Sequence, residues 1–181
     1  MIELLYTVTM LRLSNTILGC GVFSLRTGKP VATVVAPIFN PKNLKVEGFY
    51  CTDSIDKSEL ILVEQDIRET IQNGFVIDDH DVLVEPDDLV RLRDVLNLRF
   101  ELIGKHVETM SKDKVGKVSD YAIETDTMYV QKLYASQSIL KSLTGGSLSI
   151  DRMQINEITN KRIVINDLLQ NSKVPAPAAI A

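Results

Sequence analysis

Two short stretches, Leu18-Gly-Cys-Gly-Val22 and Ile103-Gly-Lys-His-Val107, stand near the start of two diverged copies of one sequence. Matched positions lie 85 residues apart at first, then 84 apart after the first turn, and 88 apart after a later loop. The spacing changes only in stretches that carry turn residues, which chance matches would not respect. The chain is therefore predicted to contain two copies of one fold.

The matched positions are mostly apolar, as expected when a core is kept and a surface is not. They are Leu13/Leu98, Gly19/Gly104, Val22/Val107, Val31/Val115, Val34/Val118, Val46/Val130, Tyr50/Tyr134, Leu60/Leu148, Ile67/Ile155, Glu69/Glu157, Val76/Val164, Ile77/Ile165 and Asp79/Asp167. Short β-rich runs separated by turn signals, with little helix, indicate a small barrel or sandwich in each copy.

Turn residues divide the first copy into strands. Residues 26–30 contain Gly28 and Pro30 and predict a hairpin loop between strands at 22–25 and 31–35. Pro37 and the run 40–43 predict a break in the next stretch. Asn73-Gly74 is a two-residue hairpin signal.

The copies are joined by residues 85–98, which predict one short α-helix over 86–97. Pro86 suits the first helical position. Leu89, Leu92 and Leu96 fall on one stripe, which is expected to pack on one or both copies. Asn97 is the expected left-handed stop.

The quoted motifs carry a resemblance to a known family. Leu18-Gly-x-x-Val22 followed by Val31-Ala-Thr-Val34, and Ile103-Gly-Lys-x-Val107 followed by Val115-Gly-Lys-Val118, resemble the opening of a PRC-barrel domain, and residues 60–69 also fit. The family includes the cytoplasmic part of the photosynthetic reaction-centre H subunit and the C-terminal domain of ribosome maturation factor RimM. The resemblance implies a mainly β chain of two tandem small PRC-like β-barrels, related by internal duplication and joined by one short α-helix.

The expected organisation has five parts. They are an N-terminal extension 1–10, barrel one 11–84, linker helix 85–98, barrel two 99–170 and a tail 171–181. Met10 directly precedes the first copy and is an alternative translation start to Met1. The tail is rich in Pro and Ala and is expected to be disordered.

Bulk properties exclude several classes of protein. The 181 residues carry a net charge of −4 and are 45% hydrophobic, which is ordinary for a globular chain. The acidic balance argues against a nucleic-acid binder. No apolar run reaches the roughly 18 residues of a membrane span, and the start lacks the basic region of a signal peptide. Cys20 and Cys51 are too few for a disulfide framework and suit a cytoplasmic protein.

Few residues suggest chemistry. Asp78-Asp79-His80-Asp81 holds potential metal ligands, but its place after a strand favours a solvated turn. His106 is expected on a strand surface without metal partners. Cys20 would need a base, for which only His80 and His106 are available. Lys112, Lys114 and Lys117 indicate a charged hairpin tip.

The resemblance to the PRC-barrel family implies a non-enzymatic, cytoplasmic protein-interaction adaptor or scaffold without cofactor or metal, with a protein partner or self-association. The first alternative is an RNA-processing or ribosome-assembly factor of RimM type, and the second is a Cys-dependent hydrolase. The loop at 136–147 is four residues longer than its counterpart at 52–59 and adds Ile139, Leu140 and Leu143 at helical spacing. These three residues are the predicted partner contact, with closure of the barrel core as the alternative.

Overall fold

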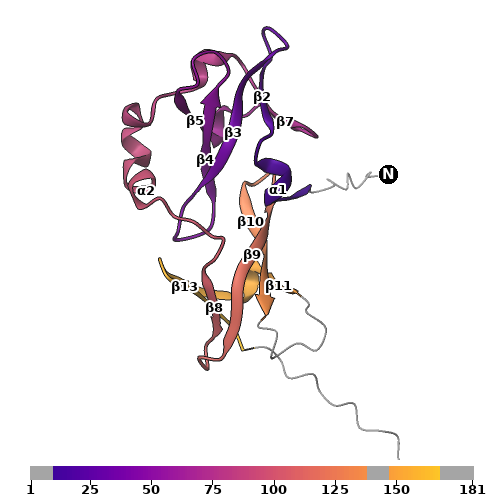
Figure 1. The fold of residues 1–181 in the computed structure, drawn as a ribbon, viewed down its shortest axis with the longest axis vertical. Helices are drawn as coiled ribbons and strands as arrows, with labels where there is room; N and C mark the ends of the chain where they lie inside the picture. Colours follow the sequence, from indigo (N-terminus) through magenta and orange to yellow (C-terminus); the bar gives the residue numbers. More distant parts are fainter. Residues whose placement is uncertain (1–9, 138–146, 168–181) are drawn as a thin grey trace, which may run out of the picture.

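The computed structural model describes residues 10–137 and 147–167. They form two β-sheet lobes stacked end to end, with a short helix on the flank of the upper lobe (Figure 1). Both sheets are mixed: one parallel strand pair sits among antiparallel pairs in each. The chain is thus mainly β.

The first lobe contains a six-stranded sheet in the order β5-β4-β3-β2-β7-β6. Its strands are β2 (Gly21–Ser24), β3 (Pro30–Phe39), β4 (Val46–Asp53), β5 (Glu59–Val63), β6 (Glu69–Ile71) and β7 (Gly74–Ile77). The 3₁₀ turn η1 (Glu64–Asp66) links β5 to β6, and η2 (His80–Val82) follows β7. β2 and β7 form the parallel pair, with Gly21 opposite Gly74.

The second lobe repeats this order as β11-β10-β9-β8-β13-β12. Its strands are β8 (His106–Thr109), β9 (Lys114–Glu124), β10 (Tyr129–Gln137), β11 (Ser147–Asp151), β12 (Ile155–Ile158) and β13 (Arg162–Ile165), with the 3₁₀ turn η5 (Arg152–Gln154) before β12. β8 and β13 form its parallel pair. Each strand has its counterpart at the spacing read from the sequence, so the predicted duplication is confirmed.

A three-residue strand breaks the symmetry. β1 (Leu11–Leu13) precedes the first lobe in the chain but pairs antiparallel with β9 of the second, with Arg12 opposite Ile123. A single helical turn, α1 (Ser14–Ile17), then leads the chain back to the first lobe. Residues 11–13, grouped by sequence with the first copy, therefore belong to the second sheet.

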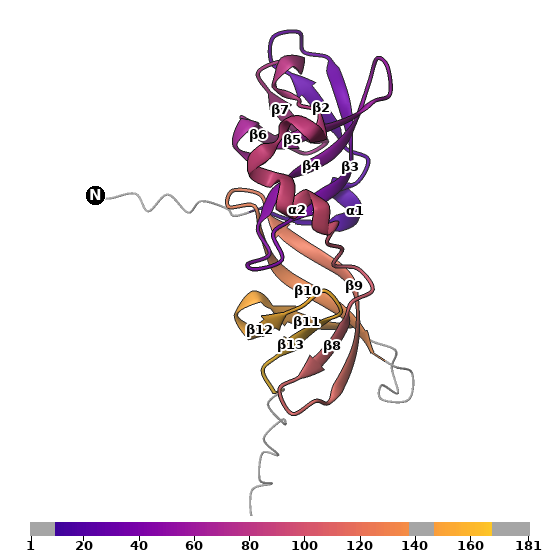
Figure 2. The same ribbon diagram turned by 90° about the vertical axis from the view of Figure 1, so that its left-hand side faces the viewer.

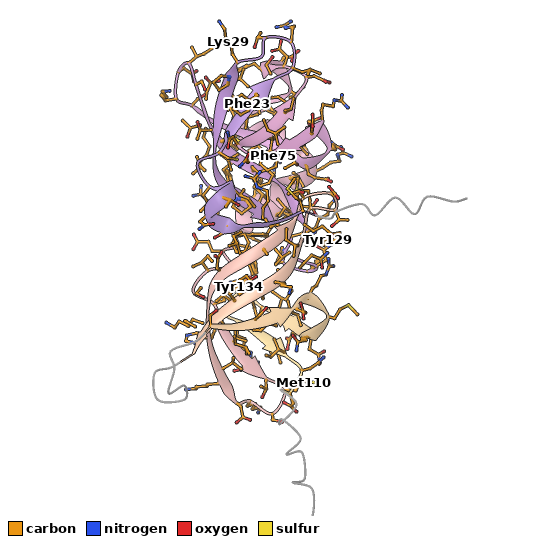
Figure 3. All side chains as sticks on the ribbon, turned by 90° about the vertical axis from the view of Figure 1, so that its right-hand side faces the viewer. Phe23, Lys29, Phe75, Met110, Tyr129 and Tyr134 are labelled. Atoms are coloured by element: carbon orange, nitrogen blue, oxygen red, sulfur yellow. The ribbon has the colours of Figure 1, made fainter. Side chains whose placement is uncertain are left out.

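Equivalent loops meet where the lobes join. The Val46 N–H donates to the Met128 carbonyl at 2.7 Å, and the Val130 N–H donates to the Leu44 carbonyl at 3.1 Å. Leu44 and Met128 both adopt left-handed backbone, with φ of 57° and 54°. Figure 3 places Tyr129 at this junction. Leu44 is equivalent to Met128 and Val46 to Val130, so the two hydrogen bonds are exchanged when the lobes are exchanged. The lobes are therefore related by an approximate two-fold axis.

The apolar core runs through both lobes as one cluster. Phe39 of the first lobe meets Tyr121 of the second edge to face, with ring centroids 5.2 Å apart. Such pairs add about 0.5–1.5 kcal/mol beyond the area they bury. The two lobes therefore share a packed interface and are not joined by the linker alone.

The linker is helical but not one helix. Pro86–Asp88 and Val90–Leu92 are 3₁₀ turns (η3 and η4), and only α2 (Arg93–Leu98) is α-helical. Leu89 interrupts the helix with φ −87° and ψ 73°. Arg99, with φ 40°, is the left-handed stop where Asn97 was predicted. The leucine stripe does pack on the first lobe, as predicted, because Leu89 and Leu92 join Leu96 against Ile38 and Ile61 of the outer sheet face.

Pro37 lies inside β3, where the sequence predicted a break. Its counterpart Tyr121 shows why proline is tolerated there. The Tyr121 N–H donates to the Asp120 side chain at 2.7 Å and not to a neighbouring strand. A proline without that N–H removes no ladder bond at such an edge position.

The expected mainly β architecture, with two duplicated units and a short helix between them, is confirmed. The expected closed barrels are not seen: among the described residues, no strand pair joins β5 to β6 or β11 to β12, so each sheet is open at its ends. In that same part of the chain, no helix has the length and apolar character needed to cross a bilayer.

Candidate binding groove beside β3

A hollow of about 220 Å³ lies on the first lobe between β3 and α2, the helix that faces the viewer in Figure 2. We call it the groove. It is lined by Val35, Ala36, Pro37, Ile38, Phe39, Tyr50, Glu59, Val95, Arg99, Phe100 and Glu101. Most of these side chains are apolar, and three charged ones are exposed. An apolar hollow with a few polar groups is the usual form of a binding site.

Comparison with the second lobe explains why the hollow exists. There the equivalent surface of β9 is covered by β1 and α1. Ser14 donates to the Asp120 carboxylate through its hydroxyl and, at 3.3 Å, through its backbone N–H. In the first lobe the counterparts of Asp120 and Ser14 are Ala36 and Arg99, which cannot make this contact. The segment around Arg99 is therefore not bound to β3 in this way, and a hollow remains between them.

Helix α2 provides a fixed wall. Leu96 is 8% exposed and packs against Ile38 and Ile61 on the outer sheet face. Val95 contacts the same cluster and also lines the groove. Burial of a leucine side chain contributes on the order of 1.5–3 kcal/mol. This packing holds the α2 side of the groove in place, while residues 99–101, which follow α2, complete the lining.

The groove has a polar rim around Tyr50. Burial raises the pKa of the Tyr50 phenol, and the Arg99 guanidinium lowers it by a smaller amount. The phenol is therefore neutral at physiological pH and able to donate a hydrogen bond. Val35 is 54% exposed at the mouth of the groove. The arrangement suits an apolar ligand with main-chain or other neutral polar groups.

The cluster Asp78–Asp81 is the predicted solvated turn only in part: Asp78 and Asp81 are exposed, but Asp79 is not. Asp79 is only 8% exposed. Its carboxylate accepts from the Ser24 hydroxyl at 2.9 Å and pairs with Arg26. Its pKa is lowered, first by a backbone hydrogen bond from His80 and then by Ser24. Asp79 thus fastens the end of β7 to the β2–β3 turn.

Other members of that cluster also have partners. His80 pairs with the Asp53 carboxylate, which is buried and also accepts backbone N–H groups of its own loop. Asp78 accepts from Arg68 Nε at 2.9 Å. The sequence signal that would have revealed a structural role was the match of Asp79 with Asp167. Asp167 closes the corresponding turn by accepting the Ser111 N–H at 3.0 Å.

The thiols do not have the environment of a nucleophile. Burial raises the pKa of Cys20, and it raises the pKa of Cys51 to about 12. A reactive cysteine needs the opposite shift, because the thiolate is the nucleophile. His106 lies exposed on β8, as predicted. The raised thiol pKa values therefore offer no support for a Cys-dependent hydrolase.

The remaining predicted sites have mixed outcomes. Ile139, Leu140 and Leu143 lie outside the described residues, as does the tail from 168 onward. Lys112, Lys114 and Lys117 are exposed around the β8–β9 turn, as predicted. Among residues 10–137 and 147–167, no three His, Cys, Asp or Glu side chains are grouped to hold a metal ion. Sequence reasoning did not find the groove, because it is formed by residues 35–39 meeting residues 95–101.

Comparison with protein-family models gave no match to this chain, and comparison with curated proteins gave none either.

Proposed function

We propose that this chain is a non-enzymatic adaptor of the cytoplasm, built from two PRC-like β units, that binds a protein partner through the groove beside β3. The observation that carries the proposal is an apolar groove with a rigid wall at a sheet edge. The repeated strand order and the PRC-like motifs of both copies support the assignment to that fold family. The half-buried and buried thiols, Cys20 and Cys51, suit a reducing compartment.

The test is affinity capture from extracts of the native host with the full chain as bait. Val35→Asp places a charge in the mouth of the groove without opening the core, because Val35 is 54% exposed. Val90→Asp, at a residue that is 69% exposed and outside the groove, is the matched control. We expect a partner retained by the wild type and by Val90→Asp but lost from Val35→Asp. Identical captured sets for all three baits would contradict the proposal.

The capture also discriminates the ribosome-assembly alternative. Recovery of ribosomal subunits with all three baits, abolished by ribonuclease, would favour a factor of RimM type. The acidic net charge of −4 argues against that result.

The longer loop of the second copy remains a separate predicted contact. If Leu140 and Leu143 present an apolar surface, replacing both with Ser abolishes partner binding or self-association and leaves the melting temperature unchanged. Sedimentation and thermal melting of the double variant measure both properties. Unfolding of the variant would identify the two leucines as core residues and end this interpretation.

A further inference from the structure

We propose that the groove binds an extended peptide segment of a partner protein as an added strand, antiparallel to β3. The inference rests on the proposed function and specifies its partner. The segment carries apolar side chains at alternate positions and an uncharged residue between them. The argument comes from the second lobe, where the chain already places a strand of this kind on the equivalent edge.

β1 is the internal example. Leu11, Arg12 and Leu13 pair with Glu124, Ile123 and Ala122 of β9. The Thr125 N–H donates to the Met10 carbonyl at 3.1 Å. Since backbone groups of a strand alternate in direction, Ile123 also faces β1. The register therefore gives the edge positions that take the added strand.

The same positions of β3 are uncovered. The counterpart of Ile123 is Phe39, and the counterpart of Tyr121 is Pro37. β2 pairs with β3 only from Pro30 to Thr33, and Cys20 accepts from Val34 just beyond. From residue 36 to residue 39, none of the described strands pairs with this edge of β3. The groove lies along that same stretch.

The chain's own counterpart of β1 does not occupy the edge. Leu96-Asn97-Leu98 is the counterpart of Leu11-Arg12-Leu13, but it lies in α2. Leu96 is buried against the outer face of the first sheet. Releasing these residues to form a strand would give up that packing. Within residues 10–137 and 147–167 no other strand takes its place, so the edge is open to a segment of another chain.

The central residue of the partner strand differs from that of β1. Arg12 donates across the junction to the Gln72 carbonyl at 3.1 Å. The counterpart of Gln72 is Asn160, whose carbonyl already accepts Lys105 Nζ at 2.6 Å. A basic residue in the partner strand would compete for this acceptor with the like-charged Lys105 ammonium. An uncharged β-branched residue suits the position, and the apolar lining of Ile38, Val95 and Phe100 suits its neighbours.

The probe is a synthetic peptide, Thr-Met-Leu-Val-Leu-Ser, which is residues 9–14 with Val in place of Arg12. Two N-methylated forms test main-chain pairing. Methylation at the central Val blocks the N–H that would face β3, whereas methylation at the preceding Leu blocks one that faces away. Titration onto the full chain should show binding of the unmodified and Leu-methylated peptides. The Val-methylated peptide should bind about 10-fold more weakly, because it loses one backbone hydrogen bond to β3 and its methyl group crowds the strand.

Amide chemical shifts locate the peptide. We expect changes at Ala36, Ile38 and Phe39 and at residues 95–101, and loss of binding in Val35→Asp but not in Val90→Asp. Changes along β9 at residues 122–124 would instead show exchange with β1 and would overturn the proposal. So would equal affinity of both methylated peptides, or no binding at about 1 mM, which corresponds to about −4 kcal/mol.

Self-association is the competing occupant. A dimer in sedimentation experiments that Val35→Asp dissociates would assign the edge to a second copy and overturn the partner-strand proposal. Failure of strand addition is distinguishable from failure of the proposed function. If partner capture still depends on Val35 while the peptide does not bind, the adaptor function stands and the groove takes a ligand of another shape.

Discussion

Replacing Arg12 with Met should destabilise the whole chain, because this one side chain ties the added strand of the second lobe to the first lobe. Arg12 is 7% exposed. Its guanidinium donates to the carbonyl of Ile71 at 3.2 Å, at the end of β6, to that of Gln72 at 3.1 Å, in the β6–β7 turn, and to that of Thr16 in α1. It also lies 5.9 Å from the centre of the Phe75 ring.

The size of the effect follows from these contacts. Hydrogen bonds to a charged group contribute roughly 1.5–3 kcal/mol each. Three such bonds would set an upper limit of about 9 kcal/mol. Part is recovered, since Met keeps the apolar stem, the guanidinium no longer has to be desolvated, and the exposed turn at Gln72 can rehydrate. We expect a net loss of about 3 kcal/mol. For a chain of this length that lowers the melting temperature by about 6–12 °C.

Urea denaturation and thermal melting of Arg12→Met measure this loss. Arg91→Met is the matched control, because Arg91 is exposed in η4 and its replacement should change stability by less than about 0.5 kcal/mol. Arg12→Lys should fall between the two, since one ammonium cannot reach all three carbonyls. A loss below about 1 kcal/mol in Arg12→Met would refute the role of Arg12 as the tie between lobes.

Three further changes test the fold. Leu92→Asp should cost about 2–3 kcal/mol in urea denaturation, because Leu92 packs against the outer sheet face, and an unchanged midpoint would contradict that packing. His80→Ala should raise the pKa of Asp53 toward its usual value of 3.8, because the His80 hydrogen bond is the main cause that lowers it. A lowered pKa stabilises the folded state above that value and loses its effect as the pH falls through the folded pKa, so the variant's stability deficit should vanish in acid. A chain of residues 10–171 should fold, whereas a chain of 14–171 should melt lower, because it lacks β1; equal melting would show that β1 contributes nothing.

Sequence reasoning recovered the elements whose residues act within one copy. The repeat predicted two units of the same strand order because apolar residues facing each core changed little, as Val34 and Val118 show. Sequence reasoning failed where the structure of a segment depends on residues outside its own copy. Pro37 looks like a strand break, yet it lies at an edge position that needs no N–H. The linker looks like one helix, but the backbone at Leu89 leaves the helical region.

The groove could not be predicted for a related reason. It results from a difference between the copies, namely Ala36 and Arg99 in the first lobe where Asp120 and Ser14 make a contact in the second. An alignment displays these pairs but does not say that they face one another. Whether they face one another depends on the path of β1 across the junction. β1 has only three residues, and its sequence does not predict which strand it pairs with. The site therefore becomes visible only when the two lobes are compared in three dimensions.

The junction shows how the duplicated halves diverged while keeping one geometry. Lys45 and Tyr129 are equivalent residues, and they face one another in an antiparallel bridge. Lys45 Nζ pairs with Glu64 at 3.0 Å, whereas the Tyr129 ring stacks under Arg152, with the guanidinium carbon 3.9 Å from its centre. Glu64 and Arg152 are also equivalent, so an ion pair in one lobe corresponds to a cation–π contact in the other. The two lobes thus use different residue pairs at the same place. Replacing one residue of a pair with its counterpart from the other lobe would place two like charges, or an aromatic ring without its cation, at the junction. The two residues of each pair are therefore expected to change together, while the backbone bonds of Leu44 and Met128 stay the same in both copies.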